Sequence, residues 1–341
     1  MAVPSEILSA FGFSPEGIEK VTGGLINATY SVKSAGVPIA ALQQLHPVFA
    51  ATVNIDIEAI SDILAALGMT TPTLIRTAEN RLYAVHEDKV WRALSWVPGK
   101  CYGKIPSLKV AEEGAKLIAR FHRALDGHDY QFQFKREGVH DTSAHLRKLR
   151  MVQCETRLLP DGTESLRQVI LSQAESLPAL PSTPNRIIHG DLKISNLLFN
   201  DDDSGLCLID LDTMARGSIA YELGDALRSW ANPQGENVAC PSIDVDILAA
   251  VARGYAQEGR GILSTDEIGS VVTGLETVSL ELAARFCVDA FEDSYFGWDP
   301  SRFASRRTHN LMRSRGQLSL SRSVASRRPQ LQELWAAPFI R

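Results

Sequence analysis

The residues best suited to chemistry lie in two short segments near the middle of the chain. Asp191, Lys193 and Asn196 stand within six residues, and Asp210 follows fourteen residues after the asparagine. Carboxylate and amide oxygens are ligands that Mg²⁺ takes in proteins, so Asn196 and Asp210 are candidate metal ligands. The Asp191 carboxylate could accept the proton of an attacking hydroxyl group, and Lys193 could bring a positive charge to a phosphate. These residues therefore predict phosphoryl transfer to an alcohol.

The spacing matches the pattern H-R-D-L-x-x-x-N of protein kinases, which is followed by a second metal-binding aspartate. Residues 189–196 read HGDLKISN, and residues 209–212 read IDLD. We expect His189 to shape the loop through packing and backbone hydrogen bonds rather than to act as a base. Asp212 is a further candidate metal ligand, or it could orient its loop.

Two apolar stretches between the candidate metal ligands predict a β-hairpin. Residues 197–199 and 206–209 read as short strands, and residues 201–205 read as a turn. A hairpin would bring Asn196 and Asp210 together, as one metal ion requires. The acidic turn lacks the ligand spacing and the terminal Glu of a calcium loop, so we expect it to be solvated.

Several parts of a regulated protein kinase are missing from the sequence. It has no G-x-G-x-x-G near its beginning, no D-F-G and no A-P-E. Only nine residues separate Asp212 from Glu222, too few for a long activation segment. The pattern therefore favours a kinase that acts on a small molecule.

The chain resembles the aminoglycoside phosphotransferase and choline kinase superfamily. The resemblance is carried by residues 23–30, 91–99, 189–196, 209–213 and 221–225. Within the superfamily the chain most resembles the N-acetylhexosamine 1-kinases, through residues 42–45, 209–213 and 310–317. The resemblance implies an enzyme that uses ATP and Mg²⁺ to phosphorylate a sugar or an amino sugar.

The hydrophobic pattern divides the chain near residue 98. The expected strands before this point are residues 26–32, 39–45, 74–76, 81–86 and 89–95, with a helix at 56–67. Val97-Pro98-Gly99 then breaks the pattern, and helices are expected at 107–125, 244–257 and 265–292. We therefore expect a two-lobed α+β fold of the protein-kinase type. Residues 1–97 would form a nucleotide-binding N-lobe with a small antiparallel sheet and one main helix. Residues 98–341 would form a larger, mostly helical C-lobe with the catalytic loop and the substrate site.

The nucleotide-binding residues of the N-lobe give weaker signals. Gly23 and Gly24, followed by Asn27 and Thr29, could bend over the phosphates so that backbone N–H groups donate to them. A glycine pair before a strand is also an ordinary turn, and it is the resemblance that favours phosphate binding.

Gln43 is the main departure from the usual kinase pattern. Most kinases place a lysine on this strand, where it contacts the α- and β-phosphates. The N-acetylhexosamine 1-kinases that the chain resembles also carry glutamine here, which implies an active enzyme. The missing charge leaves open a nucleotide-binding pseudokinase or regulatory module, although the intact catalytic residues speak against it. Adenine is expected to contact the backbone between Leu94 and Val97.

The substrate site is expected in the C-lobe, because the reacting hydroxyl group must reach Asp191. Sugar hydroxyls favour carboxylates, arginine and aromatic rings. The candidates are Arg228, Arg285, Asp289, Asp293 and Tyr295. All are residue types that also occur at surfaces and in buried ion pairs. An aminoglycoside, choline or homoserine-type kinase is the alternative, and an aminoglycoside or choline acceptor would need a strongly acidic pocket.

A basic run stands apart from the rest of the chain. Residues 301–328 contain eight arginines and no acidic residue. Such a run could attract nucleic acid or another polyanion. It lacks interleaved stacking aromatics, so we favour a basic helical face packed on an acidic body.

Composition is typical of a folded enzyme. The chain has 341 residues, of which 45 % are apolar, and this is enough for a substantial core. The net charge is −5. The five cysteines are scattered without C-x-x-C spacing, so we expect reduced thiols. No signal peptide and no apolar run of bilayer length is found. These features predict a cytoplasmic enzyme with no membrane partner.

Overall fold

An antiparallel sheet organises the first part of the computed structural model, which describes residues 3–21, 26–155 and 159–340. Its strand order is β1-β2-β3-β6-β4, and β5 pairs with β6. The strands are β1 (Ile18–Lys20), β2 (Ala28–Ser34), β3 (Val37–Gln44), β4 (Leu74–Ile75), β5 (Ala84–His86) and β6 (Lys89–Ser95). Gly23 and Gly24, which were expected near phosphate, lie outside the described residues.

Two helices accompany this sheet. Helix α1 (Ser5–Phe11) packs against the sheet in a cluster that contains Tyr30 and Trp91. Helix α2 (Val53–Ala66) belongs instead to the larger core, where Ile57 and Ile60 pack with residues of the second lobe. The sequence predicted α2 but not α1, because seven residues are too few to display a helical period.

The buried carboxylate of Asp56 ties α2 to the second lobe. Its Oδ1 accepts hydrogen bonds from the Tyr130 hydroxyl group and the Gln133 N–H, both at 2.8 Å. Its Oδ2 accepts from the Phe134 N–H, also at 2.8 Å. All three donors lie more than seventy residues further along the chain. The position of α2 is therefore set by tertiary contacts.

The chain leaves the first sheet after β6. The Trp96 N–H still donates to the Ile39 carbonyl at 3.1 Å. Residues 97–99 then lead to β7 (Lys100–Cys101), which pairs with β9 (Leu197–Phe199) in a second sheet. Strand β9 also pairs antiparallel with β10 (Gly205–Leu208), which is the hairpin predicted from the sequence. A third, two-stranded sheet joins β8 (Arg186–Ile188) to β11 (Ala215–Gly217).

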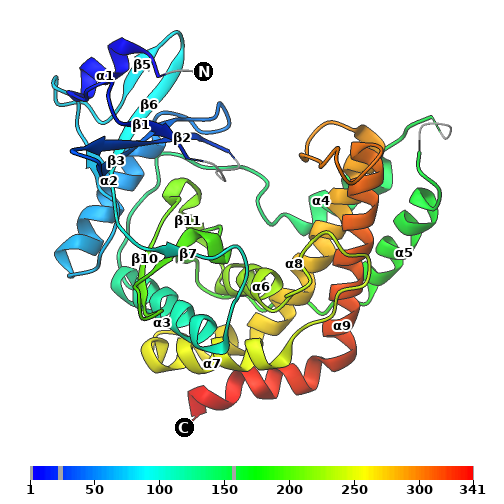
Figure 1. Cartoon of the computed structure of the whole chain (residues 1–341). Coiled ribbons are helices and arrows are strands. Elements are labelled where there is room, and N and C mark those ends of the chain that lie inside the picture. The colour runs from blue at the N-terminus through cyan, green and yellow to red at the C-terminus, as the bar shows by residue number, and fades with distance from the viewer. Residues whose placement is uncertain (1–2, 22–25, 156–158, 341) are drawn as a thin grey trace.

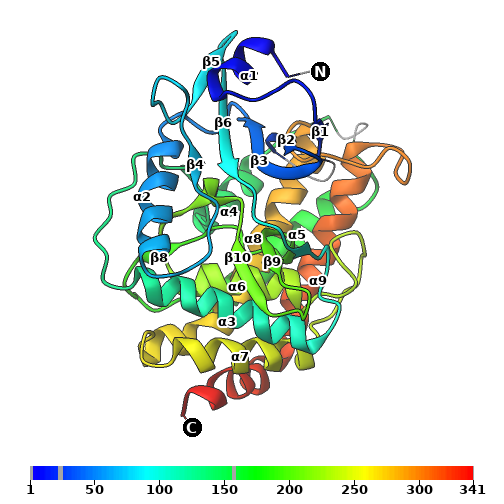
Figure 2. The ribbon, with the colours of Figure 1, turned by 60° about the vertical axis from the view of Figure 1, so that its left-hand side comes forward.

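Helices form most of the second lobe (Figures 1 and 2). They are α3 (Leu108–Leu125), α4 (Thr142–Met151), α5 (Thr163–Glu175), α6 (Ile219–Trp230), α7 (Val245–Gly259), α8 (Thr265–Glu292) and α9 (Arg306–Ile340). Helix α3 lies against α7 in both views. Helices α6 and α8 cross so closely that a Cβ atom on Gly274 would lie 1.9 Å from the Ala220 carbonyl oxygen. The predicted α+β fold, with a small sheet lobe and a larger helical lobe, is confirmed.

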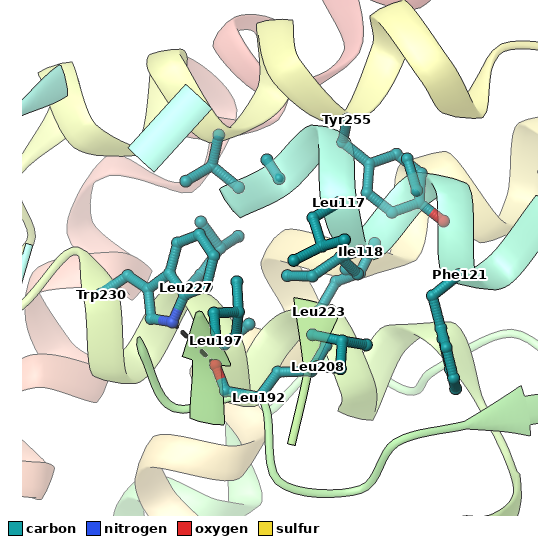
Figure 3. Close-up of a cluster of buried hydrophobic side chains, with 14 of the residues drawn as sticks. Leu117, Ile118, Phe121, Leu192, Leu197, Leu208, Leu223, Leu227, Trp230 and Tyr255 are labelled. Atoms are coloured by element: carbon teal, nitrogen blue, oxygen red, sulfur yellow. Dashed lines mark hydrogen bonds between the residues drawn. The ribbon is translucent and has the colours of Figure 1, made fainter. Parts of the chain in front are cut away.

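A buried apolar cluster packs against residues 189–197 (Figure 3). Leu192 and Leu197 come from this segment and its hairpin, and Trp230 comes from the end of α6. The Trp230 Nε1–H donates to the Leu192 carbonyl oxygen at 2.7 Å, the dashed line in Figure 3. The core therefore fixes the backbone of this segment as well as its side chains.

Arginines of the basic run bind residues of α8 and of the segment between α8 and α9. Arg307 donates to the Ala290 carbonyl at 2.8 Å, and Arg313 donates to the Gly297 carbonyl at 2.8 Å. Arg328 forms a salt bridge with the buried Glu276 at 2.7 Å. These contacts support the packed basic face. Within the described ranges, no helix is both long and apolar enough to cross a lipid bilayer.

Candidate active site

The loop between β8 and a short 3₁₀ helix, η2 (Ile194–Asn196), brings together three of the predicted residues. The Lys193 Nζ atom lies 2.7 Å from Oδ2 of Asp191 and 4.0 Å from Oδ2 of Asp210. Burial alone would lower the pKa of Lys193, but the charges of Asp191 and Asp210 outweigh burial and raise the pKa above its ordinary value. The lysine is therefore a cation held between two carboxylates.

The β9–β10 hairpin joins the two candidate metal ligands. The Ile209 N–H donates to the Asn196 carbonyl at 2.9 Å, so the residues that flank the hairpin are neighbours. The Asn196 amide group donates through Nδ2 to the Asp191 carbonyl at 2.9 Å. Asp210 adopts a left-handed backbone with φ of 63°. An aspartate tolerates this region better than most residues, and such strain is typical of functional sites.

The carboxyl group of Asp210 lies in an electrostatically unfavourable place. Burial raises its pKa, the charge of Asp212 raises it further, and Lys193 offsets only part of the effect. A divalent cation would relieve this accumulation of negative charge, so Asp210 and the Asn196 amide oxygen fit Mg²⁺. Among the described residues, no three His, Cys, Asp or Glu side chains form a ready-made metal cage. Mg²⁺ commonly needs only one or two protein ligands beside phosphates and water.

His189 and Gly190 shape the loop before Asp191. The Asp191 N–H donates to His189 Nδ1 at 3.3 Å, so Nε2 carries the proton and donates to the Ile209 carbonyl at 2.9 Å. This neutral tautomer fits the structural role expected for His189. Gly190 has φ of +79°, which favours glycine.

Glu222 at the start of α6 holds this loop from below. Its two carboxylate oxygens accept hydrogen bonds from the backbone N–H groups of His189 and Gly190, at 2.8 and 3.0 Å. Burial alone would raise the pKa of Glu222, but the nearby His122 and these donors lower it below its ordinary value. Sequence reasoning treated Glu222 only as part of a family motif and missed this contact.

Asp212 sits in a buried network that joins the two lobes. Its Oδ1 accepts from Arg92 Nη1 at 2.5 Å, and its Oδ2 accepts from Arg92 Nη2 at 2.7 Å. Oδ2 also accepts from Asn27 Nδ2 at 2.7 Å. The Arg92 side chain further donates through Nε and Nη2 to Gln43 Oε1, at 2.8 and 2.7 Å. Both Asp212 oxygens thus accept hydrogen bonds, an arrangement that suits the second of its two predicted roles, orientation of its loop.

Three residues expected near the nucleotide take part in or border this network. Asn27 Oδ1 accepts from the His46 N–H at 2.9 Å, and Gln43 Nε2 donates to Thr29 Oγ1 at 3.1 Å. Sequence reasoning missed Arg92 as a site residue. Its signal was present, because a charged residue in the apolar run of a predicted strand requires a buried partner. Leu94 and Val97 are half-buried at the end of β6 and just beyond it.

The predicted substrate residues separate into different environments. Arg228 on α6 is buried between Asp225 and Glu236, with both salt bridges at 2.7 Å. Arg285 on α8 lies over the Phe296 ring, 5.6 Å from its centroid.

Asp293 and Tyr295 lie on the segment after α8. Asp293 forms a salt bridge with Arg307 at 3.5 Å. Tyr295 is 62 % exposed, and its hydroxyl group accepts from Arg136 Nη2 at 3.1 Å.

Asp289 does not suit the substrate-binding role expected for it. The residue is 2 % exposed. Its carboxylate accepts hydrogen bonds from the N–H groups of Ser294, Tyr295 and Phe296 and from Asn310 Nδ2. The four donors lie 2.7 to 2.9 Å away. Asp289 therefore anchors the loop after α8, because its oxygens have no capacity left for a ligand.

A cluster of His140, Tyr221 and Glu281 next to α6 was not foreseen. The His140 ring stacks on Tyr221 with centroids 4.9 Å apart, and its Nδ1 lies 3.4 Å from Oε1 of the buried Glu281. Burial alone would lower the pKa of His140, but Glu281 and the nearby carboxylates raise it above its ordinary value. Tyr221 and Asp225 lie one turn apart on α6, so this cluster adjoins the Asp225–Arg228 pair.

Comparisons with known proteins agree with this geometry. A model of the phosphotransferase enzyme family matches residues 17–260. The structure is similar to an amicoumacin kinase solved with AMP-PNP and Ca²⁺, with a TM-score of 0.62 and 13 % identity over 92 % of this chain and 91 % of that one. An aminoglycoside phosphotransferase from Alicyclobacillus acidocaldarius gives a TM-score of 0.60 and 17 % identity over 97 % of each chain. A microcompartment-associated aminopropanol kinase gives 0.61 and 17 % over 96 % of this chain and 97 % of that one.

Proposed function

Because the chain belongs to the phosphotransferase enzyme family, and is thus a phosphotransferase, we propose that it transfers the γ-phosphoryl group of ATP to a hydroxyl group of a sugar or amino sugar. The observation that carries the proposal is the position of Lys193 between two carboxylates, 2.7 Å from Asp191 and 4.0 Å from Asp210. Asp191 would face the acceptor and Asp210 would help to hold the metal, so Lys193 would lie where the phosphoryl group must pass.

Each residue of the loop then has one task. Asp191 accepts a hydrogen bond from the reacting hydroxyl group, orients it for in-line attack and takes its proton. Lys193 compensates negative charge on the transferring group. Asn196 and Asp210 would hold Mg²⁺, which neutralises phosphate charge when bound. Asp212 positions this turn through Arg92.

The N-lobe, residues 1–97, would bind the nucleotide. Gly23 and Gly24 would contribute backbone N–H groups to the phosphates, and adenine would lie against the backbone of residues 94–97. The presence of Asp191, Lys193, Asn196 and Asp210 in one constellation speaks against a pseudokinase.

The pairing of the carboxylates near α6 and α8, where we place the phosphoryl acceptor, supports a neutral, hydroxyl-rich substrate. The Asp225 and Glu236 carboxylates are both paired with Arg228, at 2.7 Å each. Glu281 accepts from the Thr142 hydroxyl group at 2.7 Å and faces His140. A polycation would require unpaired carboxylates here, whereas sugar hydroxyls can exchange hydrogen bonds with paired ones. We assign Arg285, Asp293 and Tyr295 to the rim of this site.

An amino-alcohol or antibiotic acceptor is the second candidate. The similar structures include an aminopropanol kinase and a spectinomycin phosphotransferase, the latter in complex with ADP and spectinomycin. These acceptors carry amino groups, so a cationic substrate remains consistent with the family.

An ATP-consumption screen with Mg²⁺ tests the proposal. The panel would contain hexoses, N-acetylhexosamines, aminoglycosides, spectinomycin, choline, aminopropanol and homoserine, with Asp191→Asn protein as the control. Turnover confined to hexoses or N-acetylhexosamines, absent in the control, is the expected result, and the position of phosphate in the product would identify the hydroxyl group. Turnover confined to aminoglycosides, spectinomycin, choline, aminopropanol or homoserine would replace the sugar assignment with the second candidate.

A further inference from the structure

The cation that most kinases carry on the strand at Gln43 has a counterpart on the neighbouring strand. Gln43 and Arg92 are directly opposed in the β3–β6 register. Arg92 is 1 % exposed, and its guanidinium group donates to Gln43 and to Asp212. A positive charge therefore lies beside Gln43, although that residue is neutral.

The amide group of Gln43 is matched to this arginine. Its oxygen accepts two hydrogen bonds from Arg92, and its nitrogen donates to Thr29 Oγ1 at 3.1 Å. A lysine side chain has donors only, so it could not replace the acceptor. It would leave Arg92 Nε without its partner and would place a second cation beside the buried arginine.

The same arginine reaches the turn that holds Asp210. Asp212 occupies the 3₁₀ turn η3 (Leu211–Thr213), and its side chain is fully buried against Arg92. Asp210 precedes this turn by one residue and has a left-handed backbone. A buried bidentate pair fixes both the distance and the orientation of its carboxylate partner. The turn is thus fixed to the N-lobe sheet from a residue 120 positions earlier in the chain.

We propose that Arg92 is a positioning residue for the metal-binding turn, and that Gln43 is the acceptor which holds Arg92 in place. The inference rests on the proposed function, because it takes Asp210 as a metal ligand. It assigns to β6 the cation that other kinases carry on β3.

Nucleotide binding by the full chain tests this inference without any acceptor. Affinity for a non-hydrolysable ATP analogue would be measured by calorimetry with and without Mg²⁺, for wild type, Arg92→Gln and Gln43→Lys. Both variants should lose about 10- to 100-fold of the affinity gained from Mg²⁺, as expected when a group that orients a ligand is removed. The affinity of Arg92→Gln for the metal-free nucleotide should change little, because Arg92 is buried and its donors are taken up by Gln43 and Asp212.

Two further measurements keep the test sharp. Gln43→Glu keeps an acceptor for Arg92 and should retain most of the Mg²⁺-dependent gain. Hydrogen exchange in metal-free protein should accelerate at residues 209–214 in Arg92→Gln while the melting temperature and the exchange of β9 stay near wild type.

The outcomes separate this inference from the proposed function. A Gln43→Lys protein with an unchanged Mg²⁺ effect would overturn the role of Arg92 and Gln43 while leaving the kinase proposal intact. Arg92→Gln and Gln43→Lys could both lose hydrogen-exchange protection throughout the protein and melt at a lower temperature. If Gln43→Glu shows the same losses and bound ligand does not restore them, Arg92 would be only a fold-stabilising residue. If the nucleotide affinity of the wild-type protein is the same with and without Mg²⁺, both proposals are contradicted.

Discussion

Gly190 lies so close to Thr213 that a Cβ atom on the glycine would come within 2.4 Å of the threonine carbonyl oxygen. The Thr213 hydroxyl group in turn donates to the His189 carbonyl at 2.8 Å. The loop that carries Asp191 and the turn that carries Asp210 therefore pack backbone against backbone. The contact depends on a residue without a side chain.

Gly190→Ala should cost both stability and turnover. The Cβ atom meets backbone rather than a flexible side chain, so the loop must shift, and φ of +79° adds strain. The expected loss in the free energy of unfolding exceeds the cost of about 1–3 kcal/mol that backbone strain alone imposes. A displaced catalytic group should lower kcat by on the order of 10²-fold. Gly127→Ala is the matched control, because Gly127 has φ of +76° and nothing within 4 Å of its Cβ position. Equal effects in both variants would assign the whole loss to backbone strain.

Asp191→Asn should abolish turnover and preserve nucleotide binding. The amide cannot accept the proton of the attacking hydroxyl group, so kcat should fall by about 10²–10⁴-fold. Asp201→Asn is the control, because it is the same substitution at a fully exposed residue in the turn of the hairpin. Steady-state kinetics and calorimetry measure the two effects. Normal kcat in Asp191→Asn would remove this residue from the mechanism.

Trp230→Phe should destabilise the protein more than Trp91→Phe does. The Trp230 Nε1–H donates to the Leu192 carbonyl in the loop that carries Asp191, whereas the buried Trp91 Nε1 has no hydrogen-bond partner in the described part of the chain. A buried acceptor left unpaired costs about 1–3 kcal/mol. Denaturant unfolding of the two variants measures the difference. Similar costs would mean that packing, and not the hydrogen bond, sets the contribution of Trp230.

The His140–Glu281 pair should make stability depend on pH. The folded-state pKa of His140 is raised above its ordinary value, so its contribution is complete below the unfolded pKa of about 6.5 and is lost as pH rises through the folded pKa. Wild-type protein should therefore lose stability as pH rises above about 6.5, and His140→Gln should lose less over the same rise. His128→Gln at an exposed position should follow wild type. Parallel curves for wild type and His140→Gln would exclude this linkage.

Arg285→Met should weaken acceptor binding without affecting ATP. The substitution keeps much of the aliphatic stem over Phe296 but removes the charge. Loss of a charged hydrogen bond to a substrate hydroxyl group should raise the acceptor KM by about tenfold or more. Arg302→Met is the control. Arg302 also lies over an aromatic ring, 5.7 Å from the Phe303 centroid, but it is an exposed residue outside α8. An unchanged acceptor KM for Arg285→Met would place the substrate away from α8.

The sequence by itself determined the candidate catalytic loop, the hairpin and the family. Asp191, Lys193 and Asn196 lie within one loop, and a two-stranded hairpin returns the chain to Asp210. Such local spacing constrains geometry directly, because a few residues of known conformation leave little freedom. The long strands of the first sheet and the helices at 108–125 and 265–292 followed from their hydrophobic periods.

Only the tertiary structure decided the partners of buried charges. Arg92 reaches Asp212 across 120 residues, and Asp289 turned from a predicted substrate ligand into a loop anchor. No periodicity encodes these pairings, because burying a charge requires a partner but does not specify which one. The same reason explains why Asp210 and Asp212, two identical side chains close together in the chain, have different environments. Asp212 pairs with Arg92 of the other lobe, whereas Asp210 faces the candidate site near Lys193.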